Sequence, residues 1–215
     1  MQLILATNNE DKIREMKQLL DDLPVTILTR DDFLEFPDIE ETGSTLEENA
    51  ILKATGIGRF CDMPALADDS GLEVDALDGA PGVHSARYSG QEPAYIKNNE
   101  KLIAELKNVP TEKRTARFRC VIAIDWGAGS ASAVGVSSSG SKDGVDIVDG
   151  SVEGVITEDI GAARGFGYDP VFYYPPADKR FSEMTLEEKN LVSHRGLALQ
   201  KARTLIIEHF NQVRE

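Results

Sequence analysis

Cysteine, basic residues and long apolar runs are scarce in this chain of 215 residues, and each scarcity argues against a class of protein. The two cysteines, Cys61 and Cys120, have no CxxC spacing and no histidine cluster beside them. That pattern argues against a disulfide framework or a zinc site and favours a reducing cytoplasm. No apolar run approaches the roughly 20 residues of a membrane helix. The first six residues lack a basic region, so we interpret them as a strand and not as a signal peptide.

The charge balance is acidic, with 37 Asp and Glu against 23 Lys and Arg and a net charge of −14. A nonspecific nucleic-acid or anionic-membrane binder would carry a basic face, so we expect neither partner. A small phosphorylated ligand remains compatible, because a few convergent cations can outweigh the mean charge locally. The hydrophobic content of 41% indicates a globular chain.

Strand and helix patterns alternate along the chain, which predicts one α/β domain over 1–215 with a mixed sheet. Helices are predicted at 12–20, 45–60, 95–106, 185–190 and 193–213. Strands are predicted at 3–6, 25–28, 64–68, 73–77, 114–125, 133–136, 145–148, 152–157 and 171–174. The Gly- and Ser-rich segment 127–150 is predicted to be a flexible hairpin with its tip at 137–142. We expect His209, near the chain end, at the surface.

The most informative segment is Asp68-Asp69-Ser70-Gly71, which follows a short apolar run. We expect the strand to end there, with its two adjacent carboxylates on opposite faces. One carboxylate would enter a cleft while the other orients a lysine or a backbone group. Together with Lys53 and the acidic pair Glu40-Glu41, this arrangement suits Mg²⁺ and phosphate chemistry. The alternative is a solvated turn, since Asp, Ser and Gly are ordinary turn residues.

Lys53 lies on the predicted helix 45–60, which begins with a capping-box pattern at Thr45. It follows Glu48 by five residues, so the two do not form the favoured i,i+4 pair. We therefore expect its partner elsewhere, either Asp68 or a phosphate. The alternative is a solvated lysine.

The turn from Thr7 to Lys12 joins the first strand to the first helix. Such a turn presents backbone N–H groups and the positive helix end to an anion. Lys12 adds a full charge, while Thr7 and Asn9 add neutral hydrogen-bonding groups. The alternative is an ordinary helix N-cap. The segment lacks the glycines and the GK[ST] sequence of a Walker loop.

Two later motifs carry aromatic and cationic groups. In 165–170, glycines flank Phe166, whose ring could stack on a nucleobase, and Asp169 could accept hydrogen bonds from a base edge. The alternative is a tight turn around a buried Phe166. In 189–196, Ser193 is a plausible N-cap followed by His194 and Arg195. Cations at a helix N-terminus oppose its dipole, which favours an anionic or polar ligand there.

Taken together, these motifs resemble the Ham1/RdgB family of inosine triphosphate pyrophosphatases, most of all its bacterial branch. The resemblance covers nearly the whole chain in order, at 6–12, 40–54, 64–90, 165–170 and 188–199. It implies a long twisted mixed sheet flanked by helices, in two lobes with the active-site cleft between them. It also implies a cytoplasmic, Mg²⁺-dependent homodimer that hydrolyses dITP, ITP and XTP to the monophosphate and pyrophosphate.

The resemblance also implies roles for individual residues. Asp69 would activate water and, with Glu40 or Glu41, hold Mg²⁺, while Asp68 and Lys53 support it. The triphosphate would be gripped by Thr7, Asn8, Asn9 and Lys12, and Ser70 would touch the nucleotide. The base and its neighbouring groups would be bound by Phe166, Gly167, Tyr168, Asp169, Lys189, His194 and Arg195. Two departures are Asn8, where bacterial relatives often have glycine, and the length of segment 127–150.

Three other functions remain as alternatives. A Maf-like pyrophosphatase would act on modified pyrimidine or standard nucleotides, but the motifs at 165–170 and 193–195 argue against it. A catalytically silent nucleotide sensor would not need the intact set of Asp68, Asp69 and Lys53. A structural domain that docks a partner through its Gly/Ser-rich loop would lose that role, but no catalysis, on deletion of 137–142.

Overall fold

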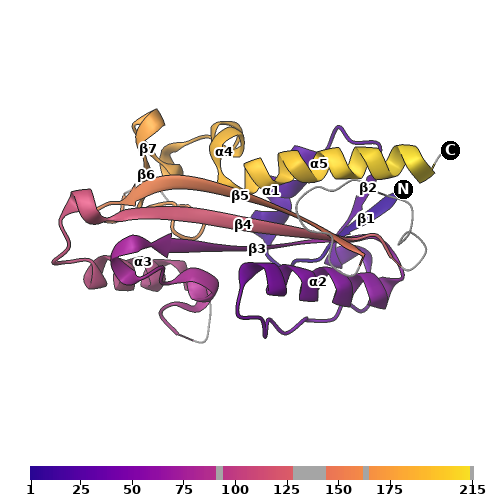
Figure 1. Ribbon diagram of the computed structural model, residues 1–215, viewed down its shortest axis with the longest axis horizontal. Helices are drawn as coiled ribbons and strands as arrows, with labels where there is room; N and C mark the ends of the chain where they lie inside the picture. Colours follow the sequence, from indigo (N-terminus) through magenta and orange to yellow (C-terminus); the bar gives the residue numbers. More distant parts are fainter. Residues whose placement is uncertain (91–93, 128–143, 162–164, 214–215) are drawn as a thin grey trace. The chain divides into compact units, whose positions relative to one another are not determined.

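The computed structural model describes residues 1–90, 94–127, 144–161 and 165–213, and strands and helices alternate along it (Figure 1). The helices are α1 (Glu10–Leu20), α2 (Leu46–Cys61), α3 (Tyr95–Glu105), α4 (Leu186–Val192) and α5 (His194–Val213). The strands are β1 (Gln2–Leu5), β2 (Thr26–Leu28), β3 (Ala65–Val74), β4 (Thr115–Asp125), β5 (Val145–Ile156), β6 (Phe172–Tyr174) and β7 (Lys179–Arg180).

The strands form one sheet in the order β2-β1-β3-β4-β5-β6-β7. Strand β1 pairs in parallel with β2 and β3, whereas β6 pairs in antiparallel fashion with β5 and β7. The predicted mixed sheet in an α/β fold is therefore confirmed. Among the described residues, no helix combines the length and the apolar composition that crossing a membrane requires.

The chain divides into two compact units. Unit 1 comprises Met1–Asp69, Cys120–Gly150 and Arg195–Glu215, and unit 2 comprises Ser70–Arg119 and Ser151–His194. Each unit has its own buried apolar cluster.

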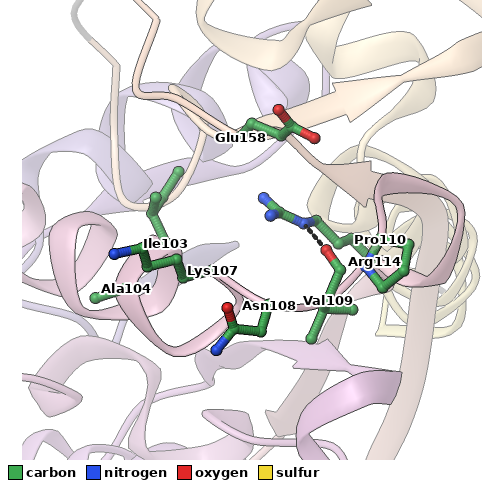
Figure 2. Close-up of a pocket in the computed structure, with 8 residues that line it drawn as sticks. All are labelled: Ile103, Ala104, Lys107, Asn108, Val109, Pro110, Arg114 and Glu158. Atoms are coloured by element: carbon green, nitrogen blue, oxygen red, sulfur yellow. Dashed lines mark hydrogen bonds between the residues drawn. The ribbon is translucent and has the colours of Figure 1, made fainter.

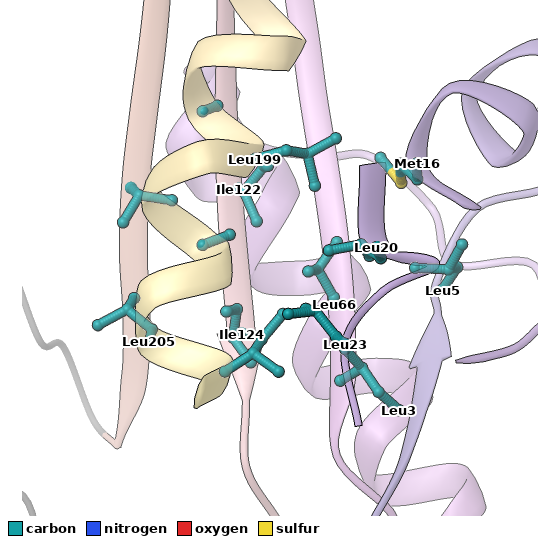
Figure 3. Packing of buried hydrophobic residues seen from close by; sticks show 14 of the residues in the cluster. Leu3, Leu5, Met16, Leu20, Leu23, Leu66, Ile122, Ile124, Leu199 and Leu205 are labelled. Atoms are coloured by element: carbon teal, nitrogen blue, oxygen red, sulfur yellow. The ribbon is translucent and has the colours of Figure 1, made fainter. Parts of the chain in front are cut away.

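In unit 1, α1 and α5 pack on one face of the strands (Figure 3). Met16 and Leu20 of α1 and Leu199 of α5 meet Leu66 of β3 and Ile122 of β4 in one buried cluster. Helix α2 covers the other face of these strands (Figure 1). Its buried side is built from Ala50, Ala54 and Ile57, which recur at helical spacing. The strands of unit 1 are thus covered by helices on both faces.

The core of unit 2 is aromatic. Phe118 of β4 lies 4.5 Å from Phe172 and 5.9 Å from Phe181, measured between ring centroids. Leu102 of α3 belongs to the same buried cluster, so α3 is anchored to these strands.

The predicted strand end at Asp68–Asp69 was wrong, because β3 runs unbroken from Ala65 to Val74 and residues 75–77 form a 3₁₀ helix. The acidic residues are tolerated inside the strand because each carboxylate meets cationic or amide groups. Gly71 serves close approach and not a turn, since a Cβ there would lie 2.4 Å from the carbonyl oxygen of Gly82.

Three further predictions need correction. The separate strands at 145–148 and 152–157 are one continuous strand, β5, and the short β7 was missed. His209 is buried, with 7% of its surface exposed, and its ring stacks on Trp126 at a centroid distance of 4.0 Å. The apolar face of α5 therefore continues into its last turns. The predicted strand 133–136 and the hairpin tip 137–142 lie outside the described residues.

Candidate active site

The adjacent carboxylates of β3 have different partners, as expected for neighbours on a strand. Asp68 meets residues of α1 and α5, whereas Asp69 meets residues of α2. Because those helices cover opposite faces of the unit 1 strands, the two side chains point in opposite directions. The predicted division of labour between the carboxylates therefore has a geometric basis.

Asp68 is completely buried among positive charges. Its Oδ2 accepts a hydrogen bond from Nε of Arg195 at 3.1 Å and lies 3.8 Å from Sγ of Cys120. Its Oδ1 lies 3.0 Å from Nζ of Lys12, and the two form an ion pair. Burial alone would raise the pKa of Asp68, but Lys12, Arg195 and Lys53 together hold it well below its usual range. Asp68 is therefore a permanent anion that keeps these cations in place.

Asp69 has the opposite electrostatic balance. Burial raises its pKa, the nearby Glu41 adds to that rise, and Lys53 and Lys12 only partly compensate. Its Oδ1 lies 3.1 Å from Nζ of Lys53. Its Oδ2 accepts a hydrogen bond from Nδ2 of Asn49 at 3.3 Å. A carboxylate with a raised pKa is suited to take a proton from water.

Lys53 joins Asp69 to the loop that precedes α2. Its ammonium lies 2.6 Å from Oε1 of Glu41, and the side chain is only 12% exposed. Burial would lower the pKa of Lys53, but the charges of Asp69, Glu41 and Asp68 outweigh burial and raise it. Lys53 is therefore a buried cation. We predicted Asp68 or a phosphate as its partner, whereas the structure pairs it with Glu41 and Asp69.

The structure distinguishes the two candidate metal ligands of the acidic pair. Glu41 is half-buried and reaches the cluster, whereas Glu40 is exposed. Glu41 and Asp69 converge on one positive centre, the ammonium of Lys53, so this pair fits a hard divalent cation. Within the residues described, no group of three or more His, Cys, Asp or Glu side chains is placed to hold a metal. Further ligands would have to come from substrate phosphate or water.

The turn before α1 is built as a helix cap. The Oδ1 of Asn9 accepts hydrogen bonds from the backbone N–H groups of Asp11 and Lys12, and Thr7 Oγ1 accepts one from the N–H of Asn9. Asn8 is exposed and donates to Asp38. The contacts of Asn9 are therefore those of the ordinary helix N-cap that we gave as the alternative. The ammonium of Lys12 points to Asp68.

Arg195 belongs to unit 1, although its motif neighbours Ser193 and His194 belong to unit 2. Its side chain is 1% exposed and forms ion pairs with Asp68 and with Glu15 of α1. Burial would lower its pKa, but Glu15 and Asp68 outweigh burial and raise it. Glu15 is buried on the apolar side of α1, beside Met16.

The remaining predicted residues gather in unit 2. Nζ of Lys189 lies 2.6 Å from Oδ2 of Asp169, and both side chains are 7% exposed. The same ammonium lies 5.6 Å from the ring centroid of Phe166. The ring of His194 stacks on Phe118 at 4.6 Å. Tyr168 is part of the unit 2 core.

The predicted residues Tyr168 and Gly167 affect the backbone of unit 2. The hydroxyl of Tyr168 donates to the carbonyl oxygen of Ser85 at 2.9 Å. Gly167 has φ +60°, a left-handed conformation that glycine adopts without strain. Ser70 is half-buried on β3, directly after Asp69. Unit 1 thus assembles carboxylates and cations, and unit 2 assembles aromatic rings around a buried Lys–Asp pair.

Comparison with known proteins decides the family. The model of the Ham1 family matches residues 3–205. The chain belongs to the Ham1 family. It is 48% identical to a dITP/XTP pyrophosphatase of Geobacter sulfurreducens, over 92% of each chain. It is 45% identical to a dITP/XTP pyrophosphatase of Shigella flexneri, over 92% of this chain and 94% of that one.

Solved structures of Ham1 proteins share this fold. The Ham1 protein of Coxiella burnetii matches with a TM-score of 0.82 and 38% identity, over 97% of this chain and 99% of that chain. The Ham1 protein of Staphylococcus aureus matches with a TM-score of 0.78 and 35% identity, with the same coverage. The predicted family and its ITPase-like fold are therefore confirmed.

Sequence reasoning missed two residues of this Ham1 site, Asn49 and Glu15. Asn49 is 3% exposed; its Oδ1 accepts from the N–H of Gly43 and its Nδ2 donates to Asp69, so it ties the Glu41 loop to the carboxylate. In both Asn49 and Glu15, a polar residue stands at a helical position where the periodicity predicts an apolar one, and this is the sequence signal for a buried polar contact. Asn49 precedes the buried Ala50, and Glu15 precedes the buried Met16.

A cavity of about 490 Å³ lies at the end of α3 in unit 2 (Figure 2). Its lining includes Lys107, Arg114 and Glu158 and none of the predicted site residues. Arg114 is buried and donates to the backbone carbonyls of Leu106, Val109 and Thr157. It therefore satisfies backbone acceptors beyond the end of α3 and belongs to the framework of unit 2.

Proposed function

We propose that this Ham1 protein hydrolyses the non-canonical purine nucleotides dITP, ITP and XTP to the monophosphate and pyrophosphate. The observation that carries the proposal is the geometry of Asp68 and Asp69, neighbours on one strand, of which Asp68 is paired with Lys12 and Arg195 and Asp69 is paired with Lys53. This arrangement places cations that can neutralise phosphates beside a carboxylate that can accept a proton from water. The names of the relatives from Geobacter sulfurreducens and Shigella flexneri support the substrate class.

Asp69 acts as the general base. It accepts a proton from a water molecule as the water oxygen forms a bond to the α-phosphorus. The bond between the α-phosphorus and the bridging oxygen then breaks, and pyrophosphate leaves with the electron pair. Lys53 keeps Asp69 ionised before the reaction, because it lies 3.1 Å from the carboxylate and lowers its pKa. Asp68 does not exchange protons; it positions Lys12 and Arg195.

Lys12 and Lys53 neutralise the triphosphate, which is the main requirement of this class of reaction. An ammonium has three donors, so Lys12 can contact phosphate oxygens while it stays paired with Asp68 at 3.0 Å. The turn at 7–9 adds polar groups from Thr7, Asn8 and Asn9. Arg195 is engaged by Glu15 and Asp68, and we assign it to positioning Asp68.

Glu41 and Asp69 would hold a divalent cation, which we propose to be Mg²⁺. Bound there, the ion would supply charge neutralisation to the phosphates and acidify the attacking water. Glu40 is exposed and is the weaker candidate of the acidic pair. Chelation by EDTA should abolish pyrophosphate release, and added Mg²⁺ should restore it.

The base is assigned to residues of unit 2. Phe166 offers an aromatic face, flanked by Gly167 and Tyr168, and the buried Asp169–Lys189 pair offers both an acceptor and a donor. Ser70 and His194 complete the proposed set. Hypoxanthine and xanthine carry a 6-keto acceptor where adenine carries an amino donor. A donor aimed at that position would leave adenine unpaired, at about 1–3 kcal/mol for each buried group.

The test is pyrophosphate release with Mg²⁺ from dITP, XTP, dATP, dGTP, dCTP and dTTP. Release from dITP and XTP alone supports the proposal. Release from pyrimidine or standard nucleotides would instead support a Maf-like or general pyrophosphatase. Silence across the panel would support a nucleotide sensor.

We further propose a homodimer in the cytoplasm. Cys61 and Cys120 are both free thiols, which suits a reducing compartment. Light scattering on the purified chain tests the oligomer, since a monomer at micromolar concentration would contradict it.

A further inference from the structure

Helix α3 supports the loop of residues 165–169 through a residue outside every motif, Asn99. The side chain is buried at 2% exposure, and its Nδ2 donates to the carbonyl oxygen of Gly167 at 3.0 Å. The orientation of the amide is fixed by chemistry, because a carbonyl oxygen can only accept a hydrogen bond. Gly167 adopts φ +60°, so Asn99 holds the loop where its backbone turns.

The same face of α3 also contacts the neighbouring residue of the loop. Tyr95 lies four positions before Asn99, one turn earlier on the same side of the helix. Its ring meets Phe166 edge to face, with centroids 5.3 Å apart and planes at 86°. Tyr95 and Asn99 therefore contact both members of the Phe166–Gly167 dipeptide.

The neighbour Asn98 shows what a purely structural asparagine looks like here. It is equally buried, donates to the carbonyls of Ser85 and Ala86, and accepts from the N–H of Ser89. By contrast, Oδ1 of Asn99 is buried and has no hydrogen-bond partner among the residues that the structure describes. A buried unpaired acceptor lowers stability, so stability alone does not account for an amide at this position. Such conflicts with good packing occur at functional sites.

We propose that Asn99 is a positioning residue that determines base specificity. By holding the carbonyl of Gly167, and with Tyr95 against the ring, it fixes the plane of Phe166 on which the purine stacks. That plane sets where the purine edge lies relative to the Asp169–Lys189 pair, which selects the base. This inference rests on the proposed function, in which Phe166 is the platform for the base. Asn99 has no part in phosphate binding or water activation, so its loss alters substrate selection and leaves chemistry at saturation unchanged.

The first variant is Asn99→Leu, which is close in size, loses the bond to Gly167 and removes the unpaired acceptor. We expect the melting temperature to change little, because the lost hydrogen bond to Gly167 opposes the gain from removing the unpaired acceptor. We expect KM for dITP to rise about five- to tenfold, the loss of one neutral hydrogen bond, with kcat unchanged. The preference for dITP over dATP should fall by a similar factor. The control is Asn108→Leu at an exposed position beyond α3, which should change neither parameter.

The second variant is Asn99→Asp, which keeps the size of the side chain and does not depend on the tolerance for leucine. At neutral pH it places a carboxylate against the carbonyl of Gly167, so binding of dIMP should weaken. At acidic pH the protonated carboxyl can donate to that carbonyl, so binding should recover toward the wild-type affinity. Calorimetry with dIMP measures this effect without turnover, and a merely structural loss would not recover in acid.

The outcomes separate this inference from the proposed function. A wild-type chain that binds dIMP but does not hydrolyse dITP contradicts the proposed reaction, and the Asn99 variants still test the base site. Equal dIMP affinity and equal dITP preference in the wild type and Asn99→Leu would overturn the role of Asn99. A wild type that hydrolyses dITP but binds no dIMP would contradict the base site at Phe166 and, with it, the role of Asn99.

Discussion

Asp68 and Asp69 are consecutive residues of one strand, yet cations hold the pKa of Asp68 below its usual range while burial raises that of Asp69. The difference arises because the strand turns the two carboxylates to opposite faces. One face provides Lys12 and Arg195, and the other provides Lys53 and Asn49 together with the like charge of Glu41. Two consecutive residues thus supply an anion that stays charged, Asp68, and a carboxylate that can exchange a proton, Asp69.

The pH dependence of catalysis should follow Asp69. Burial raises the pKa of Asp69 and Lys53 opposes that rise, so the acidic limb of kcat/KM for dITP, measured at one fixed Mg²⁺ concentration, should respond to changes beside this carboxylate. Lys53→Ala removes the ammonium that lowers this pKa, so the limb should move to higher pH. It should also lower kcat about 10²-fold, as for loss of one charge-stabilising group, and raise KM. Kinetics identical to the wild type would make Lys53 a passive residue.

Asn49 should also influence the pKa of Asp69, to which it donates a hydrogen bond. Asn49→Asp loses the donor to Oδ2 of Asp69 and adds a negative charge beside it, so the acidic limb should again shift upward. The control Asn211→Asp makes the same change at an exposed position of α5 and should leave the profile unaltered. An unchanged limb in Asn49→Asp would show that Asn49 only anchors the loop at Gly43.

Asp68 should matter for stability as well as for activity. Asp68→Asn leaves Lys12 and Arg195 without a buried counter-charge, which should cost about 3 kcal/mol in urea unfolding. The folded-state pKa of Asp68 is lowered, so its contribution is present above the unfolded pKa of about 3.9 and is lost as pH falls further. The exposed Asp22, paired with Arg203, is the control, and Asp22→Asn should have little effect. Equal losses in both variants would contradict the buried network.

Trp126 is the only tryptophan and reports on His209, which stacks on it. Burial lowers the pKa of His209. The unfolded chain therefore binds this proton more readily, and stability falls as pH drops below the unfolded pKa of about 6.5. The fluorescence of Trp126 should change with a midpoint below that value, and His209→Gln should remove the change. A midpoint above 6.5 would contradict a buried neutral imidazole.

Local patterns predicted the helices and most strands because apolar periodicity and caps are local. Asn9 and Thr45 cap α1 and α2 as their types suggest. The unbroken course of β3 was not predictable in this way, since Asp68 and Asp69 are tolerated by cations far along the chain. The prediction that His209 lies at the surface was wrong for a similar reason, because its partner Trp126 is distant in sequence.

The candidate site was predictable to a similar extent. Motif residues identified Asp68, Asp69, Lys53 and Lys12 as a group, and the structure brings these four together. Asn49, Glu15 and Asn99 were missed because a single buried polar residue on a helix resembles a solvated one until its neighbours are known. The placement of Arg195 with Glu15 likewise depends on a contact across 180 positions.

The most direct test of the account is Asp69→Asn, assayed for both dITP turnover and binding of dIMP. The amide keeps the size of the side chain but cannot accept the proton of water. We predict that turnover falls by at least about 10²-fold, the usual contribution of a general base, while dIMP affinity stays at the wild-type value. Turnover near the wild-type rate would contradict Asp69 as the base and, with it, the proposed mechanism.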